Sequence, residues 1–377
     1  MNNLRLFQSI VLNRMNFQVQ RTILSEVYMN HKNIEDFEYY RRTSNPKSDK
    51  VRIQKLYKST GLKQIQWSIP HKVMFCLDTK KDMKFAKEIV KEFIKSCDEK
   101  QLQFSGDGYR LLGRFYWSCF RLKDAEAAKD LAELEVVKEV FHNEHGHIMN
   151  GYMQILYESG HYEDLVKVCE ENYGNVKAQV SVMLAAALYR LGTPQAYAKA
   201  KSYDSETNHY RAKLITVLFA YQQKDFEFIE NVMNYFDGRL QPGKVPKLPS
   251  ANLKILLMLE KGQVKESLVM INQWLINIDE ASAFRLNIMK DVFAKFETAI
   301  DTEVANQNTE VQSLWENLQR FNNRRYRVDD MTLEQYIFKP ISLAPNPKKV
   351  VLKKRLEARN LSRGARIVGS QPDLPPE

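Results

Sequence analysis

The chain of 377 residues is 44% hydrophobic with only 14 Gly and 12 Pro, which allows a large buried core and excludes fibrous and disordered classes. Its longest uncharged apolar run covers residues 178–189, short of the roughly 20 residues that a membrane-spanning helix needs, so we expect no membrane span. The four cysteines include no C-x-x-C pair, which argues against a zinc or redox motif and fits a reducing compartment.

The net charge of +10 is concentrated at the two ends of the chain. Residues 1–61 carry a net charge of +6, residues 62–347 of −1 and residues 348–377 of +5. Because the centre is neutral, the global charge says little about nucleic-acid binding, and only a local basic face or a tail could attract phosphate. A nucleic-acid function therefore has to rest on particular residues.

The N-terminal stretch, MNNLRLFQSIVLNRMNFQVQRTILSE, carries Arg5, Arg14 and Arg21 and has no acidic residue before Glu26. An arginine-bearing, acid-free leader of this kind is typical of mitochondrial import signals. We predict a mitochondrial targeting segment over residues 1–25, with an ordinary first helix as the alternative. Residues 26–61 are expected to form an N-terminal extension.

Residues 62–322 are expected to form helix after helix, with a recurring helix-turn-helix unit. The units are CFRLKDAEAAKDL, LYESGHYEDLVKVC, LYRLGTPQAYAKAK, AYQQKDFEFIENVM and MLEKGQVKESLVMI. Their turn positions, Lys123, Gly160, Gly192, Lys224 and Gly262, follow one another at intervals of 37, 32, 32 and 38 residues. Such a period with two helices per unit predicts an all-α fold, an α-solenoid of tandem repeats.

Two stretches interrupt or follow this helical region. Residues 239–250, RLQPGKVPKLPS, hold three prolines and a glycine, which predicts a loop between repeats. Residues 323–377 are predicted to be a basic, partly disordered tail, of which residues 346–377 are not expected to have a core of their own.

Residues 146–172, GHIMNGYMQILYESGHYEDLVKVCEEN, place Asn150 early in a first helix, Gly160 at the turn and Leu165 in a second helix. With this spacing the chain resembles the pentatricopeptide-repeat family, and the order of FCLDTKKDMKFAKEIV, LYRLGTPQAYAKA and VVLKKRLEARNLSRGARI resembles animal mitochondrial members. The resemblance implies stacked helix pairs whose first helices line an RNA-binding groove, a mitochondrial location and a role in transcript processing. Val182 stands where the preceding repeat has Asn150 and cannot hydrogen-bond a base, so a base-by-base code is not expected.

Four of the seven histidines, His142, His145, His147 and His161, lie within one short stretch. Three of them within six residues suggest zinc. However, Gly146 interrupts the segment, and a helix of ten or more residues places His161 roughly 20 Å from His147. We therefore expect solvated or capping histidines, no metal and no cofactor; a metal-dependent nuclease would require the first three histidines to converge with a carboxylate.

The strongest candidate binding surface is GYRLLGRFYWSCFRL. At 100° per residue, Arg110, Arg114, Trp117 and Arg121 fall within about 60° of each other on one helix face, opposite an apolar stripe. Arginine can pair with phosphate, and an indole offers a stacking surface for a base. We predict that this row binds single-stranded RNA; the alternative is a solvated charged face with the indole half buried.

Further RNA contacts are expected from later segments. Asn150 and Gln154 share a polar face of the next repeat and could hydrogen-bond base edges; the alternative is that both are simply solvated. In RFNNRRYRVDD, Arg324 and Arg325 stand among aromatic residues and make this end electropositive, which favours non-specific attraction of phosphate.

These observations predict a non-catalytic RNA-binding protein of the mitochondrial matrix. It would support processing, maturation or stability of organellar transcripts, with a nuclease or another RNA-processing protein as a partner. The alternative is a protein-binding helical-repeat scaffold or assembly factor in the same compartment, because repeat geometry serves either use.

Overall fold

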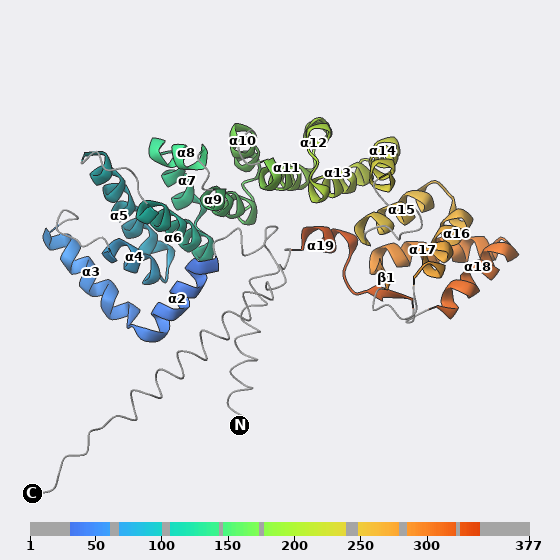
Figure 1. The fold of residues 1–377 in the computed structure, drawn as a ribbon, viewed down its shortest axis with the longest axis horizontal. Helices are drawn as coiled ribbons and strands as arrows, with labels where there is room; N and C mark the ends of the chain where they lie inside the picture. Colours follow the sequence, from blue (N-terminus) through green and yellow to red (C-terminus); the bar gives the residue numbers. More distant parts are fainter. Residues whose placement is uncertain are drawn as a thin grey trace, which may run out of the picture.

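In the computed structural model the chain forms an elongated array of helices (Figure 1). The structure describes residues 31–60, 68–99, 106–142, 146–172, 177–238, 248–278, 285–321 and 325–339. The helices are α2 His31–Thr43, α3 Pro46–Thr60, α4 Ser68–Phe75, α5 Lys80–Glu99, α6 Gly106–Leu122, α7 Ala125–Ala132, α8 Glu135–His142, α9 Gly146–Glu158, α10 Tyr162–Asn172, α11 Lys177–Leu191, α12 Pro194–Glu206, α13 Tyr210–Gln222, α14 Phe226–Asp237, α15 Leu248–Glu260, α16 Val264–Ile276, α17 Lys290–Ala305, α18 Thr309–Arg320 and α19 Leu333–Phe338. With only two short strands in these ranges, β1 Leu286–Met289 and β2 Tyr326–Asp329, the predicted all-α class is confirmed.

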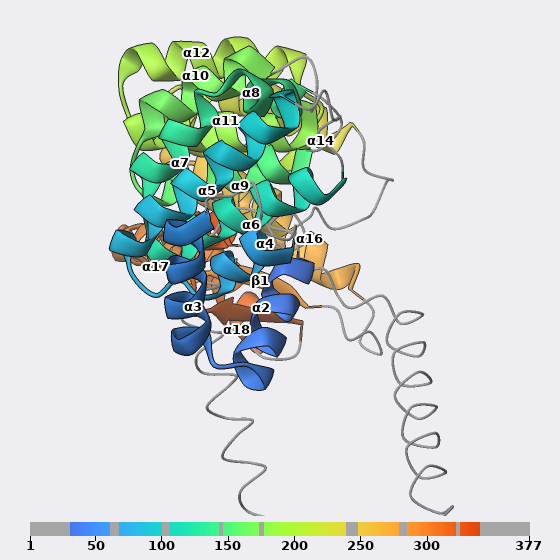
Figure 2. The same ribbon diagram turned by 90° about the vertical axis from the view of Figure 1, so that its left-hand side faces the viewer.

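From α4 to α18 the helices form consecutive pairs, α4/α5, α6/α7, α9/α10, α11/α12, α13/α14, α15/α16 and α17/α18. The first helix of each pair contacts the first helix of the next pair, and each second helix contacts the following first helix. In Figure 1, α10, α12 and α14 lie along one edge of the array with α9, α11 and α13 beside them; the turned view in Figure 2 shows the same layering end-on. We call the side of the first helices that faces away from the second helices the inner side.

The turns inside the pairs confirm the predicted turn positions. Residues with positive φ occur at all five of them, Lys123, Gly160, Gly192, Lys224 and Gly262, at values between 54° and 78°. In four of these turns the residue after the positive-φ position donates its N–H to a carbonyl five residues earlier, as from Asp124 to Cys119 at 2.9 Å. This bond satisfies a carbonyl that the helix end leaves unpaired. Gln307, with φ 63°, makes the equivalent turn between α17 and α18 and was not predicted.

The residue that follows the positive-φ position often begins the second helix as well. The side chains of Asp124, Thr193, Asp225 and Asn308 each accept a hydrogen bond from the backbone N–H three residues later. One residue therefore ends the first helix and the next starts the second helix, because the cap supplies an acceptor to an otherwise unpaired N–H. The short connection holds the two helices against each other.

The two helices of a pair bury their side chains differently. Ten consecutive residues of α13, 211–220, are buried, whereas α14 buries only Ile229, Val232, Met233 and Phe236. A helix that is buried on all sides has neighbours around its whole circumference, whereas the spacing in α14 is that of a surface helix with one apolar stripe. The first helices thus form the core of the array.

Within the predicted partly disordered tail from residue 323, residues 325–339 are ordered. β2 pairs in parallel with β1, with Leu286 opposite Tyr326, and α19 follows β2. Tyr326 and Leu333 are 1% exposed and Ile337 is 3% exposed, so this segment contributes to the core. The pairing joins strands 40 residues apart and cannot be read from local periodicity. Residues 340–377 lie outside the described residues.

Three further predictions bear on the boundaries. Part of the N-terminal extension forms α2 and α3, which pack on α4 and α6. The loop expected over residues 239–250 ends earlier, since α15 begins at Leu248; residues 239–247 and the predicted targeting segment, residues 1–25, lie outside the described residues. None of the described helices combines the length and the apolar character needed to cross a membrane.

Candidate nucleic-acid interface

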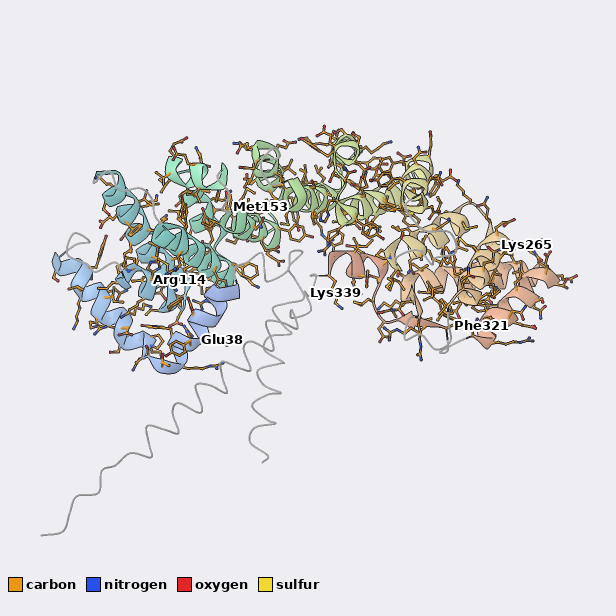
Figure 3. The ribbon with its side chains drawn as sticks, viewed as in Figure 1. Glu38, Arg114, Met153, Lys265, Phe321 and Lys339 are labelled. Atoms are coloured by element: carbon orange, nitrogen blue, oxygen red, sulfur yellow. The ribbon has the colours of Figure 1, made fainter. Side chains whose placement is uncertain are left out.

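The predicted arginine row lies on the inner side of α6, and α2 covers most of it. Figure 3 labels Arg114 on α6 and Glu38 on the neighbouring α2. The Phe37 ring lies 4.6 Å from the Trp117 indole, centroid to centroid, and leaves Trp117 8% exposed. Arg114 forms an ion pair with Asp36 at 2.7 Å, and its guanidinium lies over the Phe75 ring at 4.5 Å. The expectation of an open surface is therefore wrong for Arg114 and Trp117.

Arg121 is enclosed by carbonyl and aromatic groups. It donates to the carbonyl of Leu77, and its guanidinium lies 4.8 Å from the Phe37 ring centre and 5.5 Å from that of Trp117. Its buried Nε has no hydrogen-bond partner in the structure. Burial, together with the nearby positive charge of Arg41, lowers the pKa of Arg121 to about 10. Of the four predicted row residues, only Arg110 is exposed.

Asn150 and Gln154 do not face solvent, so their predicted contacts with base edges are wrong for this conformation. Both residues belong to α9; Asn150 is 2% exposed and Gln154 is fully buried. Gln154 donates to the Glu158 carboxylate at 3.0 Å, and the buried Oδ1 of Asn150 accepts no hydrogen bond. Periodicity placed both residues on one helix face correctly, but α9 is surrounded by other helices.

The C-terminal arginines divide between the described and the undescribed chain. Arg325 donates to the Leu275 carbonyl at 3.0 Å and lies over the Phe321 ring at 5.0 Å, so it ties β2 to α16 and its predicted phosphate contact is not available in this arrangement. Phe321 is labelled in Figure 3. Arg324 lies outside the described residues.

An exposed basic face that the sequence analysis missed lies on α3. Lys47, Val51, Lys55 and Lys58 follow a spacing of four, four and three residues, which places them on one side of the helix, and all four are exposed. Within the described chain none of the three lysines has an ion-pair or hydrogen-bond partner. The only carboxylate of α3, Asp49, bonds Arg52 and Tyr40. We call these four residues the α3 lysine face.

The lysines of this face contribute to the net charge of +6 over residues 1–61, but the sequence analysis did not assign them to one side of a helix. α3 is anchored beside α5 through Tyr57, which donates to Glu92 at 2.9 Å, and through the ion pair of Lys50 with Asp82. α5 adds the exposed Lys80 and Lys84 to this end of the molecule. The α3 lysine face is therefore presented outward by a helix that is fixed on its other side.

The neighbouring part of the molecule has the opposite charge. Residues 124–142 and 146–172, which include α7 to α10, contain 11 Asp/Glu and 3 Lys/Arg. Glu133 and Glu135, on the outside of α7 and α8, have side chains that are 79% and 81% exposed. An extended polyanion lying on the α3 lysine face would be repelled if it continued along this acidic region.

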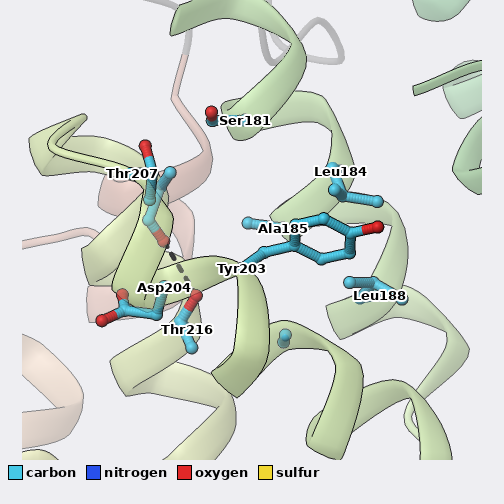
Figure 4. Close-up of a pocket in the computed structure, with 10 residues that line it drawn as sticks. Ser181, Leu184, Ala185, Leu188, Tyr203, Asp204, Thr207 and Thr216 are labelled. Atoms are coloured by element: carbon cyan, nitrogen blue, oxygen red, sulfur yellow. Dashed lines mark hydrogen bonds between the residues drawn. The ribbon is translucent and has the colours of Figure 1, made fainter. Parts of the chain in front are cut away.

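A small cavity lies between α11, α12 and α13 (Figure 4). Leu184 and Leu188 line one side, and Asp204 and Thr216 lie on the other. Its volume of about 10 Å³ is enough for about one water molecule. Asp204 is bound by Lys213 at 2.8 Å, and both side chains are buried. The cavity is too small for an organic ligand.

The described residues contain no cluster of three or more His, Cys, Asp or Glu that could hold a metal ion. Burial raises the pKa of the Cys76, Cys119 and Cys169 thiols, which disfavours the thiolate that a nucleophile requires. His161 lies 3.6 Å from Asp164 and 3.8 Å from Glu126 at the turn between α9 and α10.

Comparisons with protein-family models, curated proteins and solved structures found no match to this chain.

Proposed function

We propose that this chain is a pentatricopeptide-type α-solenoid that binds single-stranded RNA in the mitochondrial matrix. It supports processing, maturation or stability of organellar transcripts without catalysing a reaction. The repeated turn geometry and the contacts between successive first helices support the repeat architecture. The single observation that carries RNA binding is the α3 lysine face, with three exposed lysines and no competing carboxylate partner.

The proposed contact is with the phosphate backbone, because lysine ammonium groups attract phosphate without reading the base. Exposed lysines on a helix that is fixed by Tyr57 and Lys50 lose little backbone freedom on binding. The bound strand is shielded, or is presented to a nuclease that a partner supplies. The acidic region at α7 to α10 limits the strand to the end of the molecule formed by α2, α3 and α5.

The test is a titration of the full chain with a short fluorescein-labelled oligouridylate, comparing wild type with Lys47→Ala/Lys55→Ala/Lys58→Ala. We expect the triple variant to bind about 10- to 100-fold more weakly at low salt. We also expect its logarithmic salt dependence to be shallower by about 2, as for three lost phosphate contacts. The matched control is Lys138→Ala/Lys167→Ala/Lys265→Ala on other helices, which removes the same charge and should bind like wild type. Equal loss in both variants would contradict a localised site.

The alternative function, a protein-binding scaffold or assembly factor, is favoured by the acidic region at α7 to α10. A basic polypeptide rather than RNA would fit that surface. If wild type binds no RNA but forms a ribonuclease-resistant complex with a mitochondrial protein, and Glu133→Arg/Glu135→Arg abolishes that complex, the scaffold function replaces RNA binding.

The matrix location rests on the acid-free, arginine-bearing leader in residues 1–25. Fusing these residues to a fluorescent protein should direct it to mitochondria. A fusion with Arg5, Arg14 and Arg21 replaced by Gln should remain outside. Cytosolic fluorescence from the unmodified fusion would remove the location from the proposal.

A further inference from the structure

α2 presents to α6 the two chemical groups that a nucleotide also carries, an aromatic ring and an anion. The Phe37 ring is 4.6 Å from the Trp117 indole and is contacted by the Arg121 guanidinium at 4.8 Å. One residue earlier, the Asp36 carboxylate pairs with Arg114 at 2.7 Å. A base stacks on indole and on guanidinium in the same way, and a phosphate pairs with arginine as a carboxylate does.

Arg121 adds a further positive charge to the surface under α2. It is half-buried, donates to the Leu77 carbonyl and lies over two aromatic rings, and its Nε has no hydrogen-bond partner. Asp78 and Asp82 attract its charge from a distance, and Arg41, on α2 itself, repels it. An entering anion could therefore bond the Nε of Arg121 directly, which neither carboxylate does.

α2, the helix that covers this surface, is packed less tightly than α6 and α4, the helices that it contacts. None of residues 36–43 of α2 is buried, whereas Phe115 and Leu112 of α6 and Met74 of α4 are fully buried. Among the described elements that follow α3, α2 packs mainly on α4 and α6. Segments with few buried apolar side chains open at low free-energy cost.

We infer that the inner side of α6 is a subsite for one nucleotide of single-stranded RNA. The base stacks on Trp117 and a phosphate pairs with Arg114. Without RNA, Phe37 and Asp36 of α2 occupy these two positions. The inference rests on the proposed RNA binding and adds a second contact to the α3 lysine face. The exposed Arg110 marks the open end of the row, where a strand first meets it. The entering nucleotide displaces α2, and a neighbouring phosphate reaches Arg121.

The first experiment measures the affinity of the full chain for the same labelled oligouridylate. Asp36→Asn/Phe37→Ala weakens the internal competitor, so its apparent affinity should rise about 5- to 10-fold above wild type, because a larger fraction of the protein is competent to bind. Adding Trp117→Ala should abolish this gain. Phe228→Ala, which removes a half-buried ring from α14, is the control and should leave affinity unchanged.

The second experiment needs no substitution. Hydrogen exchange of the α2 amides is followed in wild type with and without oligouridylate, and RNA should accelerate exchange in α2 while leaving α13 unchanged. Unchanged or slower exchange in α2, or unchanged affinity of Asp36→Asn/Phe37→Ala, overturns the subsite while lysine-dependent RNA binding stands. Absence of binding in every variant overturns the proposed function itself.

Discussion

Two helices from opposite ends of the described chain, α2 and α19, lie across the inner side of the array, and they are held in different ways. α2 contacts α4 and α6 through exposed or half-buried side chains such as Phe37 and Asp36. α19 contacts α13, α15 and α17 through Leu333 and Ile337, which are 1% and 3% exposed. One helix covers its neighbours from outside, whereas the other is part of their core.

The arginines that these two helices cover also differ in the groups that they bind. Arg211 on α13 donates to the Ile337 carbonyl at 3.0 Å and to the carbonyl of Lys339, which is labelled in Figure 3. These are carbonyls at the end of α19 that would otherwise lack a partner.

On α6, Arg114 instead pairs with the Asp36 carboxylate of α2. Arg121 lies against the Phe37 ring of α2 while it donates to the Leu77 carbonyl, which is not part of α2. A ligand can replace the side chains with which α2 contacts these arginines. The backbone carbonyls of α19 cannot be replaced in this way, because α19 is part of the core. We therefore expect α2 to be displaceable and α19 to be fixed.

The largest expected effect comes from shortening the buried side chain of α19. Ile337→Ala should lower the free energy of unfolding by about 3 kcal/mol, because it leaves a cavity in a closed core. Urea denaturation is the measurement. Phe37→Ala removes a larger side chain from α2 but should cost about 1 kcal/mol or less, because that ring is half exposed. Equal losses would abolish the distinction between the two helices.

Next in size is the loss of the buried arginine that binds α19. Arg211→Met should cost about 2 kcal/mol, since two carbonyls lose a charged donor. It should also accelerate amide exchange in α19 selectively. Arg190→Met on α11 is the comparison: its ion pair with Glu334 is one-third exposed and should contribute about 0.5 kcal/mol. A larger effect from Arg190→Met would mean that the surface pair, not Arg211, holds α19.

A smaller effect is expected at α2, where it is best seen by proteolysis. Phe37→Ala should speed tryptic cleavage after Arg41 and Arg42 about fivefold, in proportion to the population of the opened helix. Global stability should change little. Phe228→Ala serves as the control and should leave cleavage at these sites unchanged. Unaltered cleavage in Phe37→Ala would show that the contact with Trp117 does not hold α2 down.

The smallest expected effect is a pH dependence near α19. Burial and the adjacent Arg211 lower the pKa of His209 below its usual 6.5. The folded state therefore binds this proton less readily than the unfolded state, so the stabilisation is complete above pH 6.5 and is lost as pH falls through the folded-state pKa. His209→Gln should flatten the stability profile below pH 6.5 in urea titrations. An unchanged slope would assign the effect to other groups.

The turns could be predicted because their causes are local. Gly160, Gly192 and Gly262 tolerate positive φ, and the polar residues after the turns cap the next helix. Lys123 and Lys224 were placed by their position in the repeat, although lysine does not favour this conformation. Gln307 was missed because neither its residue type nor its spacing distinguishes it.

The binding surfaces could not be predicted in the same way, because exposure depends on which segment covers a face. The 3.6-residue period places Arg114, Trp117 and Arg121 on one side of α6, and the structure agrees. Nothing in that segment indicates that Phe37, 80 residues before Trp117, lies against the indole. Conversely, the α3 lysine face was passed over because the extension had no repeat to suggest a helix there.

The sequence by itself determined the all-α class, the helix pairs and the positions of their turns, because hydrophobic period, capping and backbone conformation act over a few residues. Only the tertiary structure decided which polar residues face water. It buried Asn150 and Gln154 among neighbouring helices, covered the α6 row with α2, and returned residues 325–339 to the core. Burial depends on contacts between segments far apart in the chain, and the sequence of a single helix does not indicate which segments these are.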